Sequence, residues 1–286
     1  MLRIDPDTLT GAAEAAVLTA PAPPGAPTDL VPVRGTAVKS LVRTELPAVL
    51  VLGTCGGAGT TVTTLGLAAA AANRAEAEAD PVCVDATAFG GDLAIRGADA
   101  HAPIATLQSW LNTPHPELPS AVADCSGMTS TGVFVLPRTA DPLPRRETFS
   151  SVHTHLTQAG ALPLYDAGAP VANRGIAPLL ADPRIALLLV TTARPDAINK
   201  LKPALSWLDD HFGEFLVSRV VIAITEQNPG TGQAALAHVR AWIGSWVRTV
   251  TCVPFDSHLA AGQLVTWDKL AGATRTTFRL LLGDLQ

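Results

Sequence analysis

The chain has 286 residues, of which 48% are hydrophobic, and its formal net charge is -5 at pH 7. This length and apolar content predict a globular protein with a sizeable core, either one large α/β domain or two small ones. The acidic balance and the lack of a dense Lys/Arg run argue against broad binding to nucleic acid or anionic lipid, although a local basic patch stays open.

The four cysteines are far apart, without a C-x-x-C pair or a Cys/His cluster, and they stand at 55, 83, 125 and 252. This spacing predicts neither a structural zinc site nor a disulfide framework, and it fits reduced thiols in a cytoplasm. The start MLRIDPDTLTG lacks the basic region and apolar core of a signal peptide, and no stretch is apolar for about 18 residues. We therefore expect a cytoplasmic protein without integral membrane association.

The first 45 residues contain the Pro/Ala/Thr-rich segment LTAPAPPGAPTDLVPVRGT, which has no sustained hydrophobic period. This composition predicts a flexible N-terminal arm over residues 1–45, and a partner-binding tail is the alternative. One domain is expected to follow over residues 46–286.

From residue 47 onward, short β-branched runs alternate with longer helical patterns, which is typical of βαβ units. Strands are predicted at 48–53, 82–85, 132–137, 162–166, 185–191, 220–225 and 249–254. Helices are predicted at 60–73, 104–112, 148–159, 196–211, 232–245 and 274–284. Several strands are apolar throughout, as expected when helices bury both faces. The predicted fold is α/β, a doubly wound and mainly parallel sheet of about seven strands with helices on both faces.

The first predicted strand leads into a glycine-rich turn, whose residues are Gly56, Gly57, Ala58, Gly59, Thr60, Thr61 and Val62. Such glycines let backbone N–H groups surround an anion, and the following helix adds its positive N-terminal end. A standard phosphate-binding loop also needs a lysine after the last glycine and a Ser or Thr for Mg²⁺. Thr61 can supply the magnesium hydroxyl, but Thr60 stands where the lysine should be.

This loop resembles that of the MinD/ParA class of P-loop ATPases, whose motif is K-G-G-x-G-K-[ST]-T. The glycines and Thr61 match it, whereas Cys55 and Thr60 replace its two lysines. The family's Asp-x-Asp is similar to Asp85 followed by Thr87, so the second acid is lost. The acid that ends a later strand corresponds to Asp166.

Two further segments extend the resemblance, which covers roughly residues 46–284. FGGDL, residues 89–93, is similar to a segment of the bacterial CpaE/TadZ branch, and VPFDSHLAAG, residues 253–262, resembles a loop near the nucleotide base. The resemblance implies ATP or ADP with Mg²⁺ at the loop residues 56–62. It also implies Thr61, Asp85 and Asp166 at the metal, with Asp85 catalytic if the protein is active, and a homodimer.

Loss of both lysines removes the positive charge on which phosphoryl transfer depends. The leading hypothesis is a catalytically weak or inactive MinD/ParA-like protein that acts through protein partners in positioning or assembling a pilus, secretion or division apparatus. The alternative is an active Mg-ATP-dependent dimer switch with a variant loop. A DNA-segregation ATPase is disfavoured by the acidic balance. A substitute cation from Arg96, Arg174 or Arg194 stays open.

Three side-chain patterns outside the loop carry structural predictions. His153 and His155 lie two residues apart on a predicted helix, which makes a poor metal pair and predicts surface positions. Trp242 and Trp246 share a helical face, which suits core packing or an interface, and the core is the default prediction. The C-terminal helix has few basic residues, so we expect it to pack on the sheet and not on a membrane.

Overall fold

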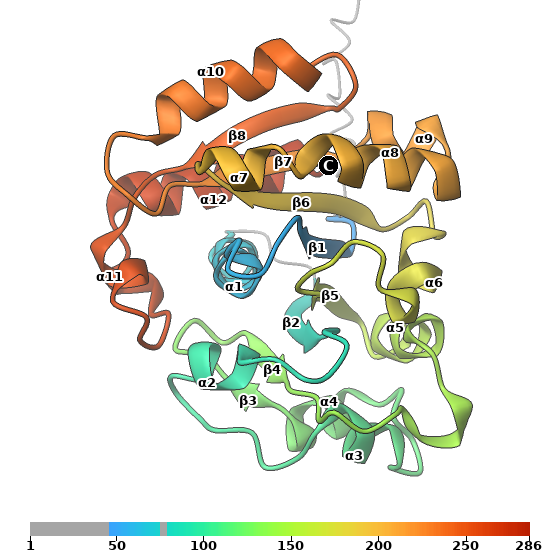
Figure 1. Cartoon of the computed structure of the whole chain (residues 1–286). Coiled ribbons are helices and arrows are strands. Elements are labelled where there is room, and N and C mark those ends of the chain that lie inside the picture. The colour runs from blue at the N-terminus through green and yellow to red at the C-terminus, as the bar shows by residue number, and fades with distance from the viewer. Residues whose placement is uncertain (1–45, 75–78) are drawn as a thin grey trace, which may run out of the picture. The chain divides into compact units, whose positions relative to one another are not determined.

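A computed structural model describes residues 46–74 and 79–286 (Figure 1). The predicted arm, residues 1–45, lies outside the described residues, so its character and the boundary at residue 46 stay predictions.

The centre of the fold is an eight-stranded sheet with the order β3-β4-β2-β5-β1-β6-β7-β8. Its strands are β1 (Val49–Gly53), β2 (Asp80–Asp85), β3 (Gly127–Met128), β4 (Phe134–Leu136), β5 (Ala161–Asp166), β6 (Ala186–Thr192), β7 (Val221–Thr225) and β8 (Thr249–Val253). Only β3 pairs antiparallel, with β4; the other neighbours are parallel. The carboxyl ends of the seven parallel strands therefore share one edge of the sheet.

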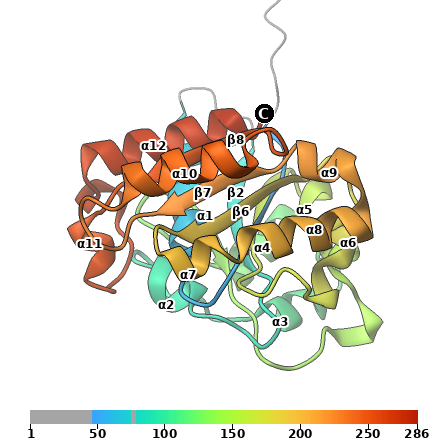
Figure 2. The same cartoon turned by 45° about the horizontal axis from the view of Figure 1, so that its top comes forward.

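Helices cover both faces of this sheet (Figure 2). One face packs against α1 (Thr60–Ala72), α2 (Leu93–Gly97) and α12 (Gly272–Asp284). The other face packs against α3 (Leu107–Leu111), α4 (Pro119–Cys125), α5 (Phe149–Gln158), α6 (Ala177–Leu180), α7 (Pro195–Ile198), α8 (Leu201–Phe212), α9 (Glu214–Ser218) and α10 (Gly232–Ile243). The short α11 (Ser257–Ala260) and the 3-10 turns η1 (Pro144–Arg146), η2 (Arg174–Ile176) and η3 (Trp267–Lys269) lie in connections.

Because helices cover both faces of the sheet, its strands carry apolar side chains on both sides. All five residues of β1 and all seven of β6 are buried. Alternate side chains of one strand enter opposite cores, so that Leu50 and Leu52 lie in one cluster and Val49 and Val51 in the other. The predicted α/β, doubly wound class is confirmed.

The structure differs from the predicted elements in three respects. It contains short helices that no predicted helix covers, and these are α2, α4, α6, α9 and α11. It adds β3, which has only two residues and gives no apolar run to detect. It also divides the predicted helix 196–211 into α7 and α8, with Asn199 and Lys200 between them. The predicted C-terminal helix does pack on the sheet side, because Phe278, Leu281 and Leu282 are buried against the core of α1.

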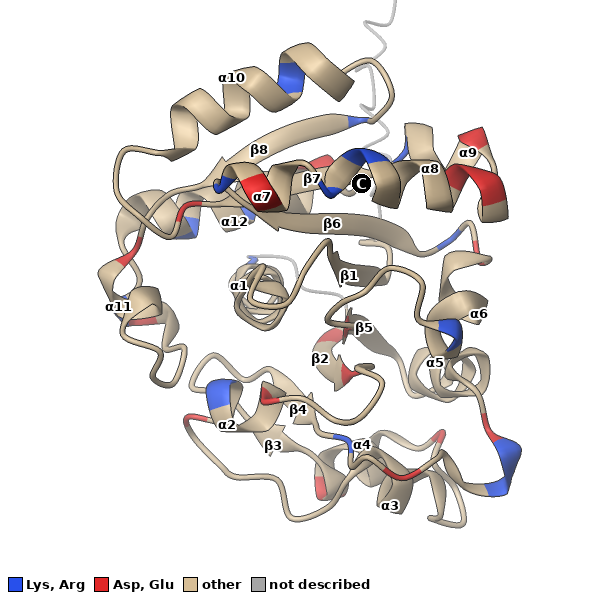
Figure 3. Ribbon diagram, viewed as in Figure 1, with Lys and Arg blue, Asp and Glu red and all other residues tan. Residues whose placement is uncertain are grey.

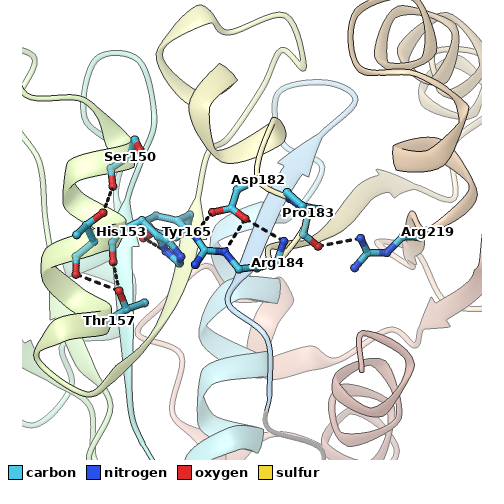
Figure 4. Close-up of polar contacts among 9 residues, drawn as sticks. Ser150, His153, Thr157, Tyr165, Asp182, Pro183, Arg184 and Arg219 are labelled. Carbon is cyan, nitrogen blue, oxygen red and sulfur yellow. Dashed lines mark hydrogen bonds and ion pairs between the residues drawn. The ribbon is translucent and has the colours of Figure 1, made fainter.

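Two predictions about side-chain exposure were wrong. His153 is buried, and its Nδ1 lies 3.0 Å from the hydroxyl oxygen of Tyr165, with Asp182 and Arg184 nearby (Figure 4). The buried tyrosine hydroxyl supplies the polar partner that lets the imidazole enter the core. Trp242 and Trp246 are instead 39% and 44% exposed, because Trp242 lies at the edge of the buried stripe of α10 and Trp246 follows the end of that helix at Ile243.

Candidate functional site

The carboxyl ends of β1, β2 and β5 bring the predicted site residues together. Asp85 and Asp166 are register partners on neighbouring strands, and both are completely buried. The glycine-rich loop follows β1, which lies next to β5. The topology therefore places both aspartates beside the loop. Asp85 and Asp166 are far apart in the sequence, so no local pattern indicates that they are neighbours.

The loop has the conformation that its glycines permit. Gly57 and Gly59 have φ angles of 75° and 94°, in the left-handed region that side chains disfavour, and Gly59 is the N-cap residue of α1. Ala58 donates its N–H to the carbonyl of Cys55 at 3.3 Å. Among the described residues, no protein acceptor meets the N–H groups of Gly57, Gly59, Thr60, Thr61 and Val62. Free amides at a helix N-terminus are the donors that bind anions.

Two side chains at the end of β7 donate hydrogen bonds to backbone carbonyls of this loop. The Thr225 hydroxyl donates to the carbonyl of Ala58 at 2.9 Å, and the Gln227 side-chain amide donates to the carbonyl of Gly57 at 2.7 Å. A trans peptide directs its C=O and N–H to opposite sides. Fixing the Ala58 carbonyl on the β7 side therefore directs the Gly59 N–H away from β7. We call Thr225 and Gln227 the β7 clamp.

Thr61 lies between two carboxylates. Its hydroxyl donates to Asp166 Oδ2 at 2.6 Å, and Asp92 Oδ1 lies at 3.2 Å from the same oxygen. Asp92 is the residue that sequence reasoning did not assign to the site, although it belongs to the FGGDL segment. A hydroxyl and a carboxylate oxygen suit Mg²⁺, which proteins commonly hold with one or two carboxylates together with substrate phosphates. Thr61 and Asp166 therefore fit the ion that the fold implies.

Burial dominates the ionisation of Asp166. Burial and, to a smaller extent, the nearby Asp85 raise the pKa of this carboxyl to about 6, against hydrogen bonds from the hydroxyls of Thr61 and Thr60 and the amide of Gly168. The site thus holds a carboxylate that is costly to ionise without a cation. Such perturbed groups are frequent at functional sites.

Asp85 is already engaged by its own turn. Its Oδ1 accepts the N–H and the hydroxyl of Thr87 at 3.0 and 2.6 Å, and its Oδ2 accepts the N–H of Gly91 at 2.6 Å. Arg138 supports the same turn by donating from Nη1 to the carbonyl of Thr87 at 2.6 Å. Asp85 therefore organises this turn in the structure, and its role at metal or in catalysis stays a prediction.

Within the described part of the chain, the three arginines considered as substitute cations, Arg96, Arg174 and Arg194, form no hydrogen bond or ion pair with the loop. Arg194 donates to both carboxylate oxygens of Asp196 at 3.0 Å. Arg96 belongs to α2, where its Nε is buried and has no hydrogen-bond partner among the described residues, and its carbonyl accepts the N–H of Val265. Arg174 lies exposed in η2. Figure 3 shows that α1 and the preceding loop carry no Lys or Arg. The hydrogen-bond donors that the loop and the first turn of α1 offer are therefore neutral backbone amides and hydroxyls.

A pocket of about 310 Å³ adjoins the loop. Its lining residues come from α1, the end of β7, the loop after β8, α11 and α12, and they are Gly59, Val62, Thr63, Thr225, Glu226, Gln227, Val253, Pro254, Phe255, Asp256, Leu259, Ala260 and Phe278. The volume is at the lower end of the ~300–1,000 Å³ range of small-molecule sites. The segment predicted to lie near a nucleotide base, 253–262, supplies much of the wall.

Two carboxylates shape this pocket by accepting backbone amides. Glu226 accepts N–H groups from Thr231, Gly232 and Phe255 at 2.8, 3.1 and 3.2 Å. Burial opposes ionisation of Glu226, but these amides outweigh it and lower the pKa. Asp256 accepts the N–H groups of His258 and Ala271, each at 2.9 Å. Both carboxylates thus hold the backbone of the loops that form the pocket wall.

Comparison with known proteins identifies the fold. No protein-family model and no curated protein matches this sequence. Among solved structures, a ParA family ATPase from Chlorobium tepidum TLS aligns with 85% of this chain and 100% of its own, at 16% identity and a TM-score of 0.62. The MinC:MinD cell division protein complex of Aquifex aeolicus aligns with 82% of this chain and 96% of its own, at 14% identity and a TM-score of 0.57.

A third similar structure was solved with ligands. Cobyrinic acid a,c-diamide synthase from Mycobacterium smegmatis, with bound ADP and magnesium, aligns with 82% of this chain and 93% of its own, at 11% identity and a TM-score of 0.51. The chain therefore has the MinD/ParA-like P-loop NTPase fold. Within the described residues, no helix is long and apolar enough to cross a membrane.

Proposed function

We propose that this chain is a MinD/ParA-like protein that binds a magnesium–nucleotide complex, hydrolyses it weakly or not at all, and acts through protein contacts. The observation that carries the proposal is a loop with free amides and no cation. Among the described residues, the N–H groups of Gly57, Gly59 and Thr60 have no protein acceptor, while Cys55 and Thr60 occupy the positions of the family's lysines.

Weak catalysis follows from the missing positive charge. The γ-phosphoryl group carries its charge through the transition state, and P-loop enzymes stabilise it with lysine, magnesium and an additional cation. Loss of one such stabilising group typically costs on the order of 10²–10³ in rate. Here two lysines are absent, and Arg194 is paired with Asp196.

Binding depends less on these lysines. The β7 clamp orients the loop, the first turn of α1 offers its amides, and the adjoining pocket of about 310 Å³ provides apolar walls. Thr61 and Asp166 would hold Mg²⁺, whose charge then replaces that of the lysines in neutralising the phosphates. We therefore expect ATP and ADP to bind only together with the metal.

The cellular role belongs to the same proposal. The GGDL segment supports a place in the CpaE/TadZ-like branch, and MinD forms a complex with the protein MinC. We propose protein partners, a homodimer and a cytoplasmic role in positioning or assembling a pilus, secretion or division apparatus. Two large apolar side chains beside the site, Phe89 and Ile95, are 79% and 76% exposed and offer contact area for a protein.

An active dimeric ATPase switch is the second candidate. The contact between Thr61 and Asp166 at 2.6 Å favours it, because this pair retains the magnesium-binding part of an active site. The two candidates agree on binding and differ on turnover.

Calorimetry and phosphate release separate the candidates. We expect wild-type protein to bind ATP and ADP with Mg²⁺ and not with EDTA, and to release phosphate at background rate. Thr61→Ala and Asp166→Ala should weaken binding, whereas Thr61→Ser, which keeps the hydroxyl, should restore it. Absence of nucleotide binding by the wild type would contradict the proposed ligand. Phosphate release that both alanine variants abolish would instead establish the active switch.

A further inference from the structure

The pocket beside the loop contains one polar side chain without a partner. Thr225 and Gln227 donate to loop carbonyls, and Glu226 and Asp256 accept backbone amides. Thr63 differs from these four residues, because within the described structure its Oγ1 is buried and has no hydrogen-bond partner. The residue is only 1% exposed and lines the pocket.

An unpaired hydroxyl at this depth is unfavourable for the protein alone. Buried polar groups are nearly always paired, and leaving one unpaired lowers the stability of the folded protein. The next residue along α1 shows the usual solution, because the buried Thr64 hydroxyl donates to the carbonyl of Thr60 at 2.9 Å. Among the described residues the Thr63 hydroxyl makes no such bond, and Thr63, unlike Thr64, is one of the residues that line the pocket.

The cavity and the anion-binding loop form one continuous site. Gly59 belongs to the loop and also lines the pocket, and Gln227 lines the pocket while donating to Gly57. Thr63 lies two residues after Thr61 in the first turn of α1. A ligand with phosphates on the loop can therefore place its remaining part in the pocket. The walls formed by Val253, Pro254 and Phe278 suit a heterocyclic ring.

We infer that the Thr63 hydroxyl is a ligand-binding group, which forms a hydrogen bond with a nitrogen or oxygen atom of the nucleoside moiety in this pocket. This inference rests on the proposed nucleotide binding and adds a residue that selects a nucleotide over a bare polyphosphate. The hydroxyl meets its hydrogen-bonding requirement only when the nucleoside is bound.

The test compares two probes in two near-isosteric variants. Thr63→Val removes the hydroxyl and keeps the branched shape, and Thr64→Val does the same one residue away, outside the pocket lining. Each full-length variant is titrated with ADP and with pyrophosphate, both in Mg²⁺, and its thermal unfolding is recorded without ligand. Thr63→Ser, which retains a hydroxyl, serves as the rescue variant.

We expect Thr63→Val to bind ADP about 5- to 10-fold more weakly than wild type, the effect of one hydrogen bond, and to bind pyrophosphate with unchanged affinity. Its midpoint of thermal unfolding should equal or exceed that of wild type, because an unpaired hydroxyl is gone. Thr64→Val should leave ADP affinity unchanged, and Thr63→Ser should recover most of it.

Three outcomes would overturn the inference, and they are distinguishable. If wild type binds Mg–ADP and Thr63→Val binds it equally well, Thr63 has no role in the ligand and the proposed nucleotide binding stands. If wild type binds no Mg–ADP at all, the proposed nucleotide binding and the inference are both overturned. An equal loss of ADP and pyrophosphate affinity in Thr63→Val would also contradict a nucleoside contact.

Discussion

At the scale of single residues, the site is defined by groups whose interactions are incomplete in the protein alone. Asp166 is buried next to Asp85 without a facing cation, and the loop amides and the Thr63 hydroxyl are unpaired among the described residues. A protein selected only for stability would pair or replace these groups. A ligand-binding site is expected to contain such unpaired groups, although they lower the stability of the ligand-free protein.

Asp166→Asn should stabilise the ligand-free protein. The rise of the Asp166 pKa from 3.8 to about 6 corresponds to a penalty on the order of 3 kcal/mol for holding the ionised carboxylate in the folded state near neutral pH. Below pH 3.8 the carboxyl is protonated in both the folded and unfolded states, and the penalty vanishes. The stability contributed by this group is therefore lost as the pH rises through about 6.

Chemical denaturation in EDTA at pH 4.5 and pH 8 measures this effect. The difference in unfolding free energy between Asp166→Asn and wild type should be positive at pH 8 and smaller at pH 4.5. Asp92→Asn is the matched control, because Asp92 contacts the same Thr61 hydroxyl but is exposed, and its change should stay within about 0.5 kcal/mol. Equal differences at both pH values would refute the assigned cause.

Site residues divide into those that the sequence identifies and those that need the fold. Thr61, Asp85 and Asp166 are recognisable because Thr61 follows the glycine-rich turn and each aspartate ends an apolar strand. Asp92 and Thr63 are not, since their importance depends on a hydroxyl 3.2 Å away and on a cavity formed by distant segments. Likewise, nothing local in SVHTHLT reveals that Tyr165 will accommodate His153 in the core.

At the scale of elements, the end of β7 controls the conformation of the loop after β1. Removing the amide in Gln227→Ala frees the Gly57 carbonyl, so the loop should spend less time in its anion-binding form. We expect about 5-fold weaker pyrophosphate binding, the effect of one hydrogen bond. Gln233→Ala on the exposed side of α10 is the matched control and should bind as wild type does. Isothermal calorimetry reports both, and equal affinities would show that the clamp is dispensable.

The packing of α1 against α12 is a second element-scale feature. A Cβ at Gly66 would overlap the ring of Phe278, a completely buried side chain, so the two helices approach closely only with glycine at this position. Gly66→Ala should therefore lower the free energy of unfolding by about 1–3 kcal/mol through overpacking. Gly283→Ala in α12, where a Cβ meets nothing within 4 Å, should raise it by up to about 1 kcal/mol. Urea denaturation of both variants checks the sign of each change.

Elements were predictable where the local pattern is strong. The apolar runs of β1 and β6 predict strands because both faces of each are covered. The two-residue β3 and the break between α7 and α8 arise from tertiary contacts and capping that no hydrophobic period encodes. The exposed Trp242 and Trp246 show the same limit, because α10 ends at Ile243 and the predicted helical face that would hold both residues does not form.

At the scale of the whole molecule, the fold matches that of ParA and MinD structures, whereas the loop after β1 differs from the family motif in charge. The chain aligns with a ParA family ATPase and with the MinC:MinD complex at 16% and 14% identity, and Cys55 and Thr60 stand where the family motif has lysines. Positioning of phosphates and stabilisation of their transfer are separate physical tasks, the first met by amides and the second by cations. A chain can therefore keep the first and lose the second.

Measurement of phosphate release from γ-labelled ATP in Mg²⁺ tests this separation most directly, with wild type and the Cys55→Lys/Thr60→Lys double variant compared under conditions where calorimetry records binding. We predict background release from wild type and a measurable rate from the double variant, because the remaining site already places Thr61 beside Asp166. Wild-type release well above background, abolished by Asp166→Ala, would contradict the proposal that this site binds without turnover.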